Sequence, residues 1–324
     1  MLLSPDQARH LYAHAVENHY AILAVNADSP AALTDCLVAA SECGAPLIIE
    51  TSLWQLTGRS FGNGDAMLGV DRYLAELRVL AETERFASIP VIYHTDHIKG
   101  PQTVEILRHA MRSHASSLSL DSSEMSHDEN IATMRQLCSL AEENGLPATL
   151  EMEAGVDDGV TPLDEARSLF GAVESDFPGY LALWAPGVGT KHGLGNDMGG
   201  FDPDAIRAHR ELASEIAGRP IGIALHGSSG LSEEQLRAGV AAGVAKVNWS
   251  SESLLIRSGA ARDYYAAAGD RLEKGHPEWK ATAMDTGVQD FVAERYVPRV
   301  IERMSVLGGA GQAAPFLDGL ASAT

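Results

Sequence analysis

Three histidines and one aspartate are the residues of this 324-residue sequence that are best suited to metal binding and acid–base chemistry. Asp96 and His97 end the stretch 93–97, which follows a short apolar run, and His192 and His226 lie downstream beside glycines. Three neutral imidazoles are a common ligand set of catalytic zinc and leave a position open for water or substrate. A lone histidine beside a strand is more often structural, so the metal interpretation requires that all three imidazoles meet. Asp96 would then lie close enough to the ion to act as a general acid or base.

Further ionisable groups surround this candidate centre. Glu151 and Glu153 alternate along a predicted strand and so share one face, where two buried carboxylates need a metal or another cation to neutralise them. Glu153 is nearer the carboxyl end of the strand and is the better candidate for an alternate metal ligand. Asp121 could support the metal ligands or hold another cation, and His94 could fix the tautomer of a ligand.

Two serine- and glycine-rich segments indicate an anion site. Residues 227–230 read Gly-Ser-Ser-Gly after the seventh predicted strand, and residues 248–251 read Asn-Trp-Ser-Ser after the eighth. Glycine lets backbone N–H groups approach an anion, and serine and asparagine add neutral donors. Because barrels frequently bind phosphate with the loops after strands seven and eight, these segments predict a phosphate cradle.

The elements that must position these groups are eight short apolar runs alternating with helical segments. We predict strands at residues 21–25, 46–49, 89–92, 117–121, 148–153, 180–184, 221–225 and 244–247. Eight βα units close a (β/α)8 TIM barrel, although a doubly wound open sheet is the alternative. The barrel is favoured because polar residues such as Asn26, Ser52 and Asn248 follow the strands, and only a barrel brings all those ends to one mouth. We expect a single domain over residues 1–324, with a helical tail from about residue 254, a loop at 54–69, and the stretch 93–97 just beyond its strand.

Composition limits the partners. The net charge is −20 and the sequence pI is about 4.9, which argues against nucleic acid or an anionic membrane as a partner. An anionic substrate must therefore be held locally by amides, hydroxyls or metal. The three cysteines suggest no disulfide framework, the first residues do not read as a signal peptide, and no apolar run approaches the ~20 residues of a membrane span. We expect a cytoplasmic protein.

The motifs in their order resemble those of class II, metal-dependent ketose-bisphosphate aldolases, which cleave fructose or tagatose bisphosphate. The resemblance covers about residues 19 to 313. The motifs are His94-Thr95-Asp96-His97, Leu120-Asp121-Ser122-Ser123 with Glu129-Asn130, Glu151-Met152-Glu153-Ala154-Gly155, Gly189-Thr190-Lys191-His192-Gly193, His226-Gly227-Ser228-Ser229-Gly230, Lys246-Val247-Asn248 and Leu307-Gly308-Gly309-Ala310-Gly311. Each motif alone is unspecific, whereas the ordered set is highly specific.

The resemblance implies a TIM barrel and reversible retro-aldol cleavage of a phosphorylated ketose to dihydroxyacetone phosphate and an aldehyde. It implies Zn²⁺ on the three histidines, with Glu153 able to join the ligands, and a proton transfer from the C4 hydroxyl to Asp96. A second divalent or a monovalent cation is a further expectation. The expected substrate- and phosphate-binding residues are Asn26, Ser52, Gly193, Gly227, Ser229, Asn248, Ser250 and Ser251. Lys191 and Lys246 could suggest Schiff-base chemistry, but neither accounts for three histidines. The resemblance also implies a homodimer or homotetramer.

Three departures from the family pattern fall where the aldehyde half would bind. The usual Asp-Pro-Arg, whose arginine holds the far phosphate, is His276-Pro277-Glu278 here. The loop at 156–159 is shorter than the family's glycine-rich acidic loop, and the segment 54–69 is enlarged. We therefore expect a C1-phosphorylated ketose without a C6 phosphate, or with another anion held by Arg59 or a different basic residue. A fructose- or tagatose-1,6-bisphosphate aldolase proper is the alternative, and a metal hydrolase or a non-catalytic phosphosugar-binding barrel represents another class.

Overall fold

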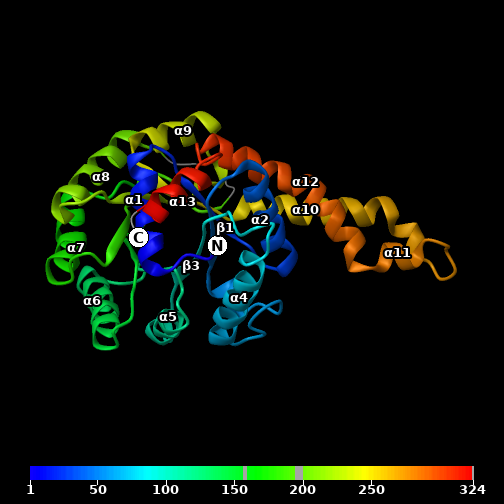
Figure 1. Cartoon of the computed structure of the whole chain (residues 1–324), viewed down its shortest axis with the longest axis horizontal. Helices are drawn as coiled ribbons and strands as arrows, with labels where there is room; N and C mark the ends of the chain where they lie inside the picture. The colour runs from blue at the N-terminus through cyan, green and yellow to red at the C-terminus, as the bar shows by residue number, and fades with distance from the viewer. Residues whose placement is uncertain (156–158, 194–199, 323–324) are drawn as a thin grey trace.

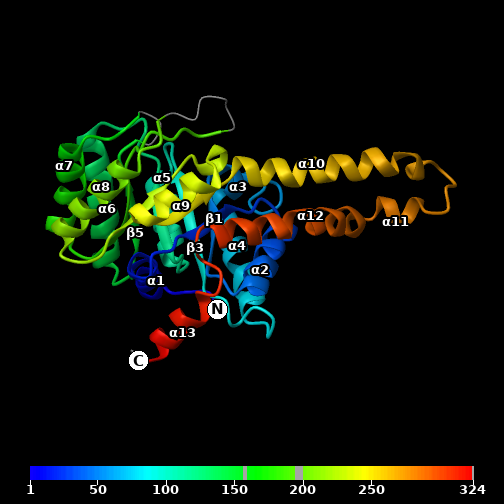
Figure 2. The ribbon, with the colours of Figure 1, turned by 90° about the horizontal axis from the view of Figure 1, so that it is seen from above.

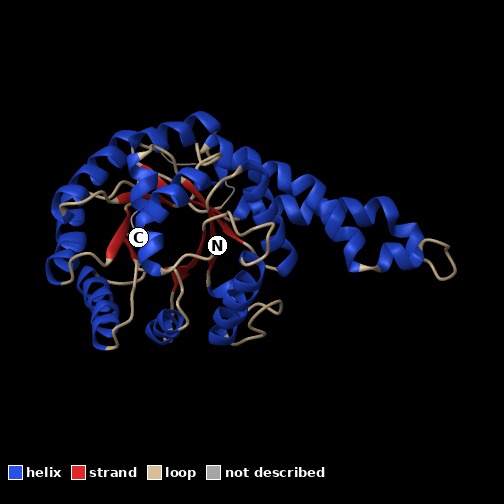
Figure 3. Cartoon of the chain, viewed as in Figure 1, coloured by secondary structure: helices blue, strands red, loops and turns tan. Residues whose placement is uncertain are grey.

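Eight parallel strands close into a barrel in chain order, with helices outside them (Figures 1 and 3). The structure is a computed structural model and describes residues 1–155, 159–193 and 200–322. The strands are β1 Ile22–Asn26, β2 Leu47–Thr51, β3 Val91–Ile98, β4 Ser117–Leu120, β5 Leu150–Glu153, β6 Leu181–Ala185, β7 Gly222–Leu225 and β8 Val244–Trp249. The pairing of β8 with β1 closes the barrel, which confirms the TIM barrel and excludes the open sheet.

Helices precede, separate and follow the strands. They are α1 Pro5–Glu17, α2 Pro30–Cys43, α3 Leu53–Thr57, α4 Ala66–Ala81, α5 Thr103–Arg112, α6 His127–Glu143, α7 Leu163–Asp176, α8 Pro203–Ala217, α9 Glu233–Ala242, α10 Ser251–Ala268, α11 Trp279–Ala283, α12 Asp285–Val306 and α13 Ala313–Ser322, with the 3₁₀ turns η1 Ser228–Gly230 and η2 Gly269–Leu272. Their starts follow local chemistry: Ser4, Ser126 and Ser232 each form a capping box that satisfies otherwise unpaired backbone N–H groups. No helix in the described ranges is both long and apolar enough to cross a membrane.

Apolar packing closes one end of the barrel and leaves the other open. Leu11 and Tyr12 of α1 form a buried cluster with Ile48, Ile92 and other strand residues, and Phe316 of α13 joins it. A larger cluster lies between the barrel and its outer helices. Since α1 and α13 cover the amino ends of the strands, the carboxyl ends form the accessible mouth.

The sequence-based boundaries were wrong at two places near the mouth. The strand β3 extends through the stretch 93–97, because those residues pair with β2 and β4. The segment 54–69 is a loop only between residues 58 and 65, because α3 covers Leu53–Thr57 and α4 begins at Ala66. Ser52 starts α3 in a capping box with Gln55, a local signal that outweighs the glycine-rich composition of the following residues.

The C-terminal helices form an arm (Figures 1 and 2). Helices α10 and α12 run side by side away from the barrel, and α11 lies near the tip. Helix α12 returns to pack against α2, so the predicted tail is partly integrated into the barrel's outer layer. The segment 276–278 lies directly before α11, at the arm's outer end.

A close backbone approach sets how α3 meets α4, and we predict that it tolerates only glycine. A Cβ at Gly69 would lie 2.1 Å from the carbonyl oxygen of Leu56, so Gly69→Ala should lower the free energy of unfolding by about 1–3 kcal/mol through overpacking. Gly259 of α10 has no atom within 4 Å of such a Cβ, and Gly259→Ala should be neutral or stabilising by up to about 1 kcal/mol. Urea unfolding of both variants measures the difference; equal stabilities would contradict the packing argument.

Candidate active site

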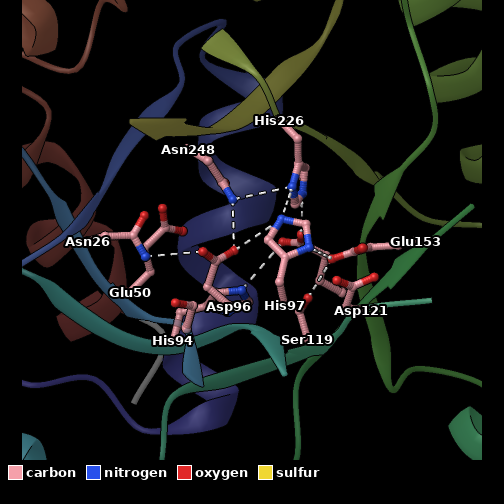
Figure 4. Close-up of polar contacts among 12 residues, drawn as sticks. Asn26, Glu50, His94, Asp96, His97, Ser119, Asp121, Glu153, His226 and Asn248 are labelled. Carbon is pink, nitrogen blue, oxygen red and sulfur yellow. Dashed lines mark hydrogen bonds and ion pairs between the residues drawn. The ribbon is translucent and has the colours of Figure 1, made fainter. Parts of the chain in front are cut away.

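An irregularity in β3 turns two adjacent side chains toward the mouth. On a regular strand Asp96 and His97 would face opposite sides. The register between β3 and β4 shifts between Thr95 and Ile98, and His97 takes the positive φ of 50° that a residue with a side chain rarely adopts. Asp96 consequently points inward, while His97 reaches over it, with its Nε2 3.5 Å from Asp96 Oδ1 (Figure 4).

The three predicted imidazoles converge at the mouth. His97, His192 and His226 each offer a ring nitrogen, and these nitrogens lie within 4.8 Å of one another. The ring centroids are 4.3 Å apart for His97 and His226, 5.3 Å for His97 and His192, and 6.0 Å for His192 and His226. Because the three residues come from β3, the loop after β6 and the end of β7, only barrel closure brings them together.

Carboxylates fix which nitrogens face inward. His97 Nδ1 lies 3.2 Å from Glu153 Oε1, and His226 Nε2 lies 2.9 Å from Glu151 Oε1. Each of those nitrogens therefore carries the proton and donates, which leaves the lone pairs on His97 Nε2 and His226 Nδ1. These two nitrogens are in close contact with each other. Two facing lone pairs are stabilised by a cation between them, so the donor set fits zinc chemistry.

The electrostatics of the pocket also favour a positive charge. Burial opposes protonation of His97, but Glu153 and Asp96 outweigh it and raise the pKa of His97 to about 10. Burial and the neighbouring His97 keep the pKa of His226 well below its ordinary value. One positive charge therefore belongs among these imidazoles, and a divalent cation would supply it without protonating either ring.

 

Two further carboxylates, those of Glu153 and Asp121, lie beside this centre. Glu153 Oε1 accepts a hydrogen bond from Ser119 Oγ at 2.8 Å, which holds it beside His97. Asp121 is contacted by Lys99 Nζ at 3.4 Å and groups with His97 and Glu153, their ligand atoms within 4.8 Å of one another. An alternate ligand at Glu153 and a supporting or cation-holding role for Asp121 both stay predictions with suitable geometry.

Asp96 lies in a pocket that keeps it ionised. It accepts hydrogen bonds from Asn26 Nδ2 at 3.1 Å and from Asn248 Nδ2 at 2.9 Å (Figure 4). Burial alone would raise the pKa of Asp96, but His97 and Lys246 outweigh it and the pKa is lowered. The result is a carboxylate with fixed orientation that can accept a proton from a group placed over the mouth.

A cavity of about 190 Å³ opens over Asp96 and the imidazoles. It is lined by Asn26, Ser52, Asp96, His97, His192, Gly193, Gly227, Ser228, Ser229, Asn248, Ser250 and Ser251. All eight predicted substrate- and phosphate-binding residues are in this lining, together with Ser228, which sequence reasoning did not single out. Ser228 Oγ donates to the Asn248 carbonyl at 2.5 Å and so ties the two serine-rich segments together.

Backbone geometry on one side of the cavity suits an anion. Gly227 has a φ of 66°, and a Cβ there would lie 2.6 Å from the Lys191 carbonyl oxygen, so only glycine fits. Helix α10 begins at Ser251, and the side chain of its N-cap residue Ser250 makes no capping hydrogen bond. In that first turn the N–H of Glu252 donates to Ser229 Oγ at 3.3 Å, so the helix start lies beside the other serine-rich segment, an arrangement that favours phosphate.

Two buried ionisable residues below the cavity, Glu50 and Lys246, were not among the predicted site residues. Lys246 is not at the end of its strand: β8 continues to Trp249, and Lys246 is fully buried with Glu50 and Glu151. The two-residue spacing from Lys246 to Asn248 was the available signal, because it places both on the inward face. The predicted short loop at 156–159 lies outside the described residues except for Gly159.

A protein-family model matches nearly the whole chain. The family model described as fructose-bisphosphate aldolase class-II matches residues 6–312. The chain belongs to this family of lyases. The match spans every strand and the arm, which agrees with the resemblance expected from the motifs.

Similar proteins share this assignment. The chain is 29% identical to fructose-bisphosphate aldolase of Ureaplasma parvum serovar 3, over 82% of this chain and 86% of that protein. It is 29% identical to fructose-bisphosphate aldolase of Treponema pallidum, over 81% of this chain and 87% of that protein.

Solved structures show the same fold. The fructose-bisphosphate aldolase structure from Campylobacter jejuni has a TM-score of 0.82 at 22% identity and covers 96% of both chains. The YdjI aldolase structure from Escherichia coli K12 has a TM-score of 0.73 at 21% identity, covering 97% of this chain and all of that one. At these identities the likeness supports the fold alone.

The converging imidazoles predict metal-dependent stability. Zinc at about a hundredfold excess over its dissociation constant should stabilise the folded protein by about 2.7 kcal/mol. His226→Ala should remove this gain, because it deletes one of the converging nitrogens. His109→Ala, which deletes an imidazole bonded to Asp71 outside the site, should keep it. Thermal unfolding with and without zinc is the measurement, and an equal gain in both variants would contradict the assignment.

Proposed function

We propose that this aldolase uses zinc to cleave a ketose 1-phosphate reversibly into dihydroxyacetone phosphate and an aldehyde that carries no second phosphate. The observation that carries the proposal is the composition of the cavity. Its described lining combines the three imidazoles, an ionised aspartate and a serine-rich anion cradle, but contains no lysine or arginine. Such a cavity has neutral donors for one phosphate and no cationic side chain for a second.

His97, His192 and His226 would hold the ion, which when bound supplies Lewis-acid stabilisation of the charge that develops on the ketone half. Asp96 would take the proton of the C4 hydroxyl while the C3–C4 bond breaks and its electron pair passes to the ketone half. The amides of Asn26 and Asn248 keep the Asp96 carboxylate aimed at that proton. In the synthetic direction Asp96 would return the proton to the new hydroxyl.

The C1 phosphate would lie between the two serine-rich segments. Gly193 and Gly227 allow close approach of the backbone, and Ser229, Ser250 and Ser251 add hydroxyl donors. The start of α10, where Ser250 makes no capping hydrogen bond, adds the positive end of a helix dipole. Neutral donors of this kind hold an anion even in a protein with a net charge of −20.

The far end of the cavity supports the unusual aldehyde. Asn26 and Ser52 are neutral residues of the cavity lining, whereas Arg59 is exposed and not in the lining. Glu278, at the position expected for the family's phosphate-holding arginine, lies 3.4 Å from Arg271 on the arm. A glutamate repels phosphate. If this segment reached the cavity of a neighbouring subunit, it would therefore not supply the arginine that usually binds the far phosphate.

Fructose- or tagatose-1,6-bisphosphate cleavage remains the second candidate, since the relatives above are named fructose-bisphosphate aldolases. The presence of Asp96 beside three imidazoles disfavours a non-catalytic phosphosugar-binding barrel, and the anion cradle disfavours a simple metal hydrolase.

We also propose a cytoplasmic homodimer or homotetramer. The exposed Leu255, Tyr265 and Trp279 of the arm helices support self-association.

Removal of the proposed base should separate catalysis from metal binding. Asp96→Ala should lower kcat by about a hundred- to ten-thousandfold, because no other group takes the C4 proton. Zinc content should stay that of the wild type, since the three imidazoles are intact. Asp71→Ala, which removes a carboxylate on α4 outside the cavity, serves as the control in steady-state cleavage assays. Unchanged turnover of Asp96→Ala would refute the role.

A substrate comparison tests the aldehyde half. We expect a higher kcat/KM for ketose 1-phosphates, such as fructose 1-phosphate and longer-chain analogues, than for fructose 1,6-bisphosphate, because the cavity lining has no cation for a second phosphate. Coupled detection of dihydroxyacetone phosphate, with and without chelator, measures both the preference and the metal requirement. A strong preference for the bisphosphate would overturn the proposed substrate while leaving the aldolase assignment intact.

A further inference from the structure

A second charged cluster lies inside the barrel beneath the imidazoles. Lys246 of β8 is fully buried, and its Nζ lies 3.0 Å from Glu151 Oε2 on β5 and 3.4 Å from Glu50 Oε2 on β2. Both glutamates are also buried. One ammonium group thus faces two carboxyl groups in a region where an uncompensated charge is strongly unfavourable.

Only one of these carboxyl groups reaches the metal centre. The second oxygen of Glu151 accepts from His226 Nε2 at 2.9 Å, so an unbroken series of contacts runs from Lys246 through Glu151 to His226. His94 Nε2 is 3.8 Å from Glu151, and burial and Lys246 keep the pKa of His94 well below its ordinary value. His94 is therefore neutral, and the ammonium of Lys246 is the charge that balances Glu151.

Glu50 has a different environment. Glu151 Oε1 accepts a hydrogen bond from His226, whereas neither oxygen of Glu50 has a hydrogen-bond partner, and Lys246 lies farther from Glu50 than from Glu151. Burial, and then Asp96, hold the pKa of Glu50 well above its ordinary range. Glu50 therefore contacts Lys246 without a hydrogen bond to the imidazoles.

We propose that Lys246 is a positioning residue for the metal centre: its contact with one oxygen of Glu151 holds the other oxygen against His226 Nε2, which presents His226 Nδ1 to the ion. The inference rests on the proposed zinc site. Loss of either member of the pair would allow the His226 ring to change tautomer and would weaken the nitrogen that faces His97. Groups that hold a metal-binding histidine in this way commonly contribute ten- to a hundredfold in metal affinity, as an order-of-magnitude expectation.

The two glutamates provide a matched test, since both contact the same lysine. Glu151→Gln removes the charge that orients His226 and should weaken zinc binding by about ten- to a hundredfold. Glu50→Gln alters a carboxyl group that contacts Lys246 but makes no hydrogen bond to an imidazole, and should change zinc affinity by less than about threefold. Competition between the purified protein and a chromophoric chelator measures both affinities. Equal losses in the two variants, or no loss in Glu151→Gln, would overturn the proposal.

Lys246→Met should weaken zinc binding as Glu151→Gln does, and the double variant should lose little more, because both changes break one series of contacts. If Lys246→Met does not fold, the glutamate pair still decides the question. Arg219→Met breaks another buried ion pair, with Glu174, and should lower stability while zinc affinity stays that of the wild type. A matching loss of affinity in Arg219→Met would show that the effect is one of general destabilisation and would overturn the proposal.

A readout on the metal-free protein separates positioning from folding. ¹⁵N NMR of the histidine rings should show His226 protonated at Nε2 in the wild type and in Glu50→Gln, and a tautomer mixture in Glu151→Gln. An unchanged tautomer in Glu151→Gln would contradict the proposal. Failure of the wild type to bind zinc would instead refute the proposed metal site, so the two failures are distinguishable.

Discussion

Negative charge buried inside the barrel is the constraint on which the rest of the site depends. Glu50, Asp96, Glu151 and Glu153 all have almost no exposed surface. An isolated carboxylate in such an interior costs several kcal/mol, so each must acquire donors, a cation or a proton. Asp96 has two asparagine amides, Glu151 has a lysine and an imidazole, and Glu153 has a serine and an imidazole. The rings of His97 and His226 are thereby oriented, and their remaining nitrogens face each other at the proposed metal site.

Barrel architecture separates stability from chemistry along one axis. Helix α1 and Phe316 of α13 fill the amino end with apolar side chains, whereas polar groups occupy the carboxyl end. Between them lies the charged layer of Lys246 and its two glutamates. Because this layer touches the imidazoles from below, the interior charge balance and the geometry of the mouth are linked.

The substrate interpretation follows from an uneven distribution of donors around the cavity. The anion cradle uses serine hydroxyls, close-approaching glycines and a helix start, none of which requires a cationic side chain. The lining also offers Asn26 and Ser52, and the segment that carries the family's arginine has Glu278 instead. An acidic protein can bind one phosphate in this way, but the described lining has no comparable provision for two.

Much of the fold and of the candidate site could be predicted from local patterns. Helix caps such as Ser4 and Ser232, and apolar runs bounded by glycine, indicated the elements, and the polar residues after the strands indicated the mouth. Local patterns were misleading at residues 54–69, where the capping box at Ser52 outweighs glycine-rich composition, and at β3, whose length depends on its neighbours. Pairing across strands is a non-local property that composition does not encode directly.

The sequence by itself therefore determined the number and order of the βα units, and it supplied the three histidines, Asp96 and the serine-rich segments on which the proposed site is built. Tertiary structure alone decided that the backbone turns at His97 so that two adjacent side chains share the mouth. It alone also decided that Lys246 lies between Glu50 and Glu151, residues separated widely along the chain. The physical reason is that barrel closure fixes which inward side chains meet, and only then does the balance of buried charge determine their protonation and orientation.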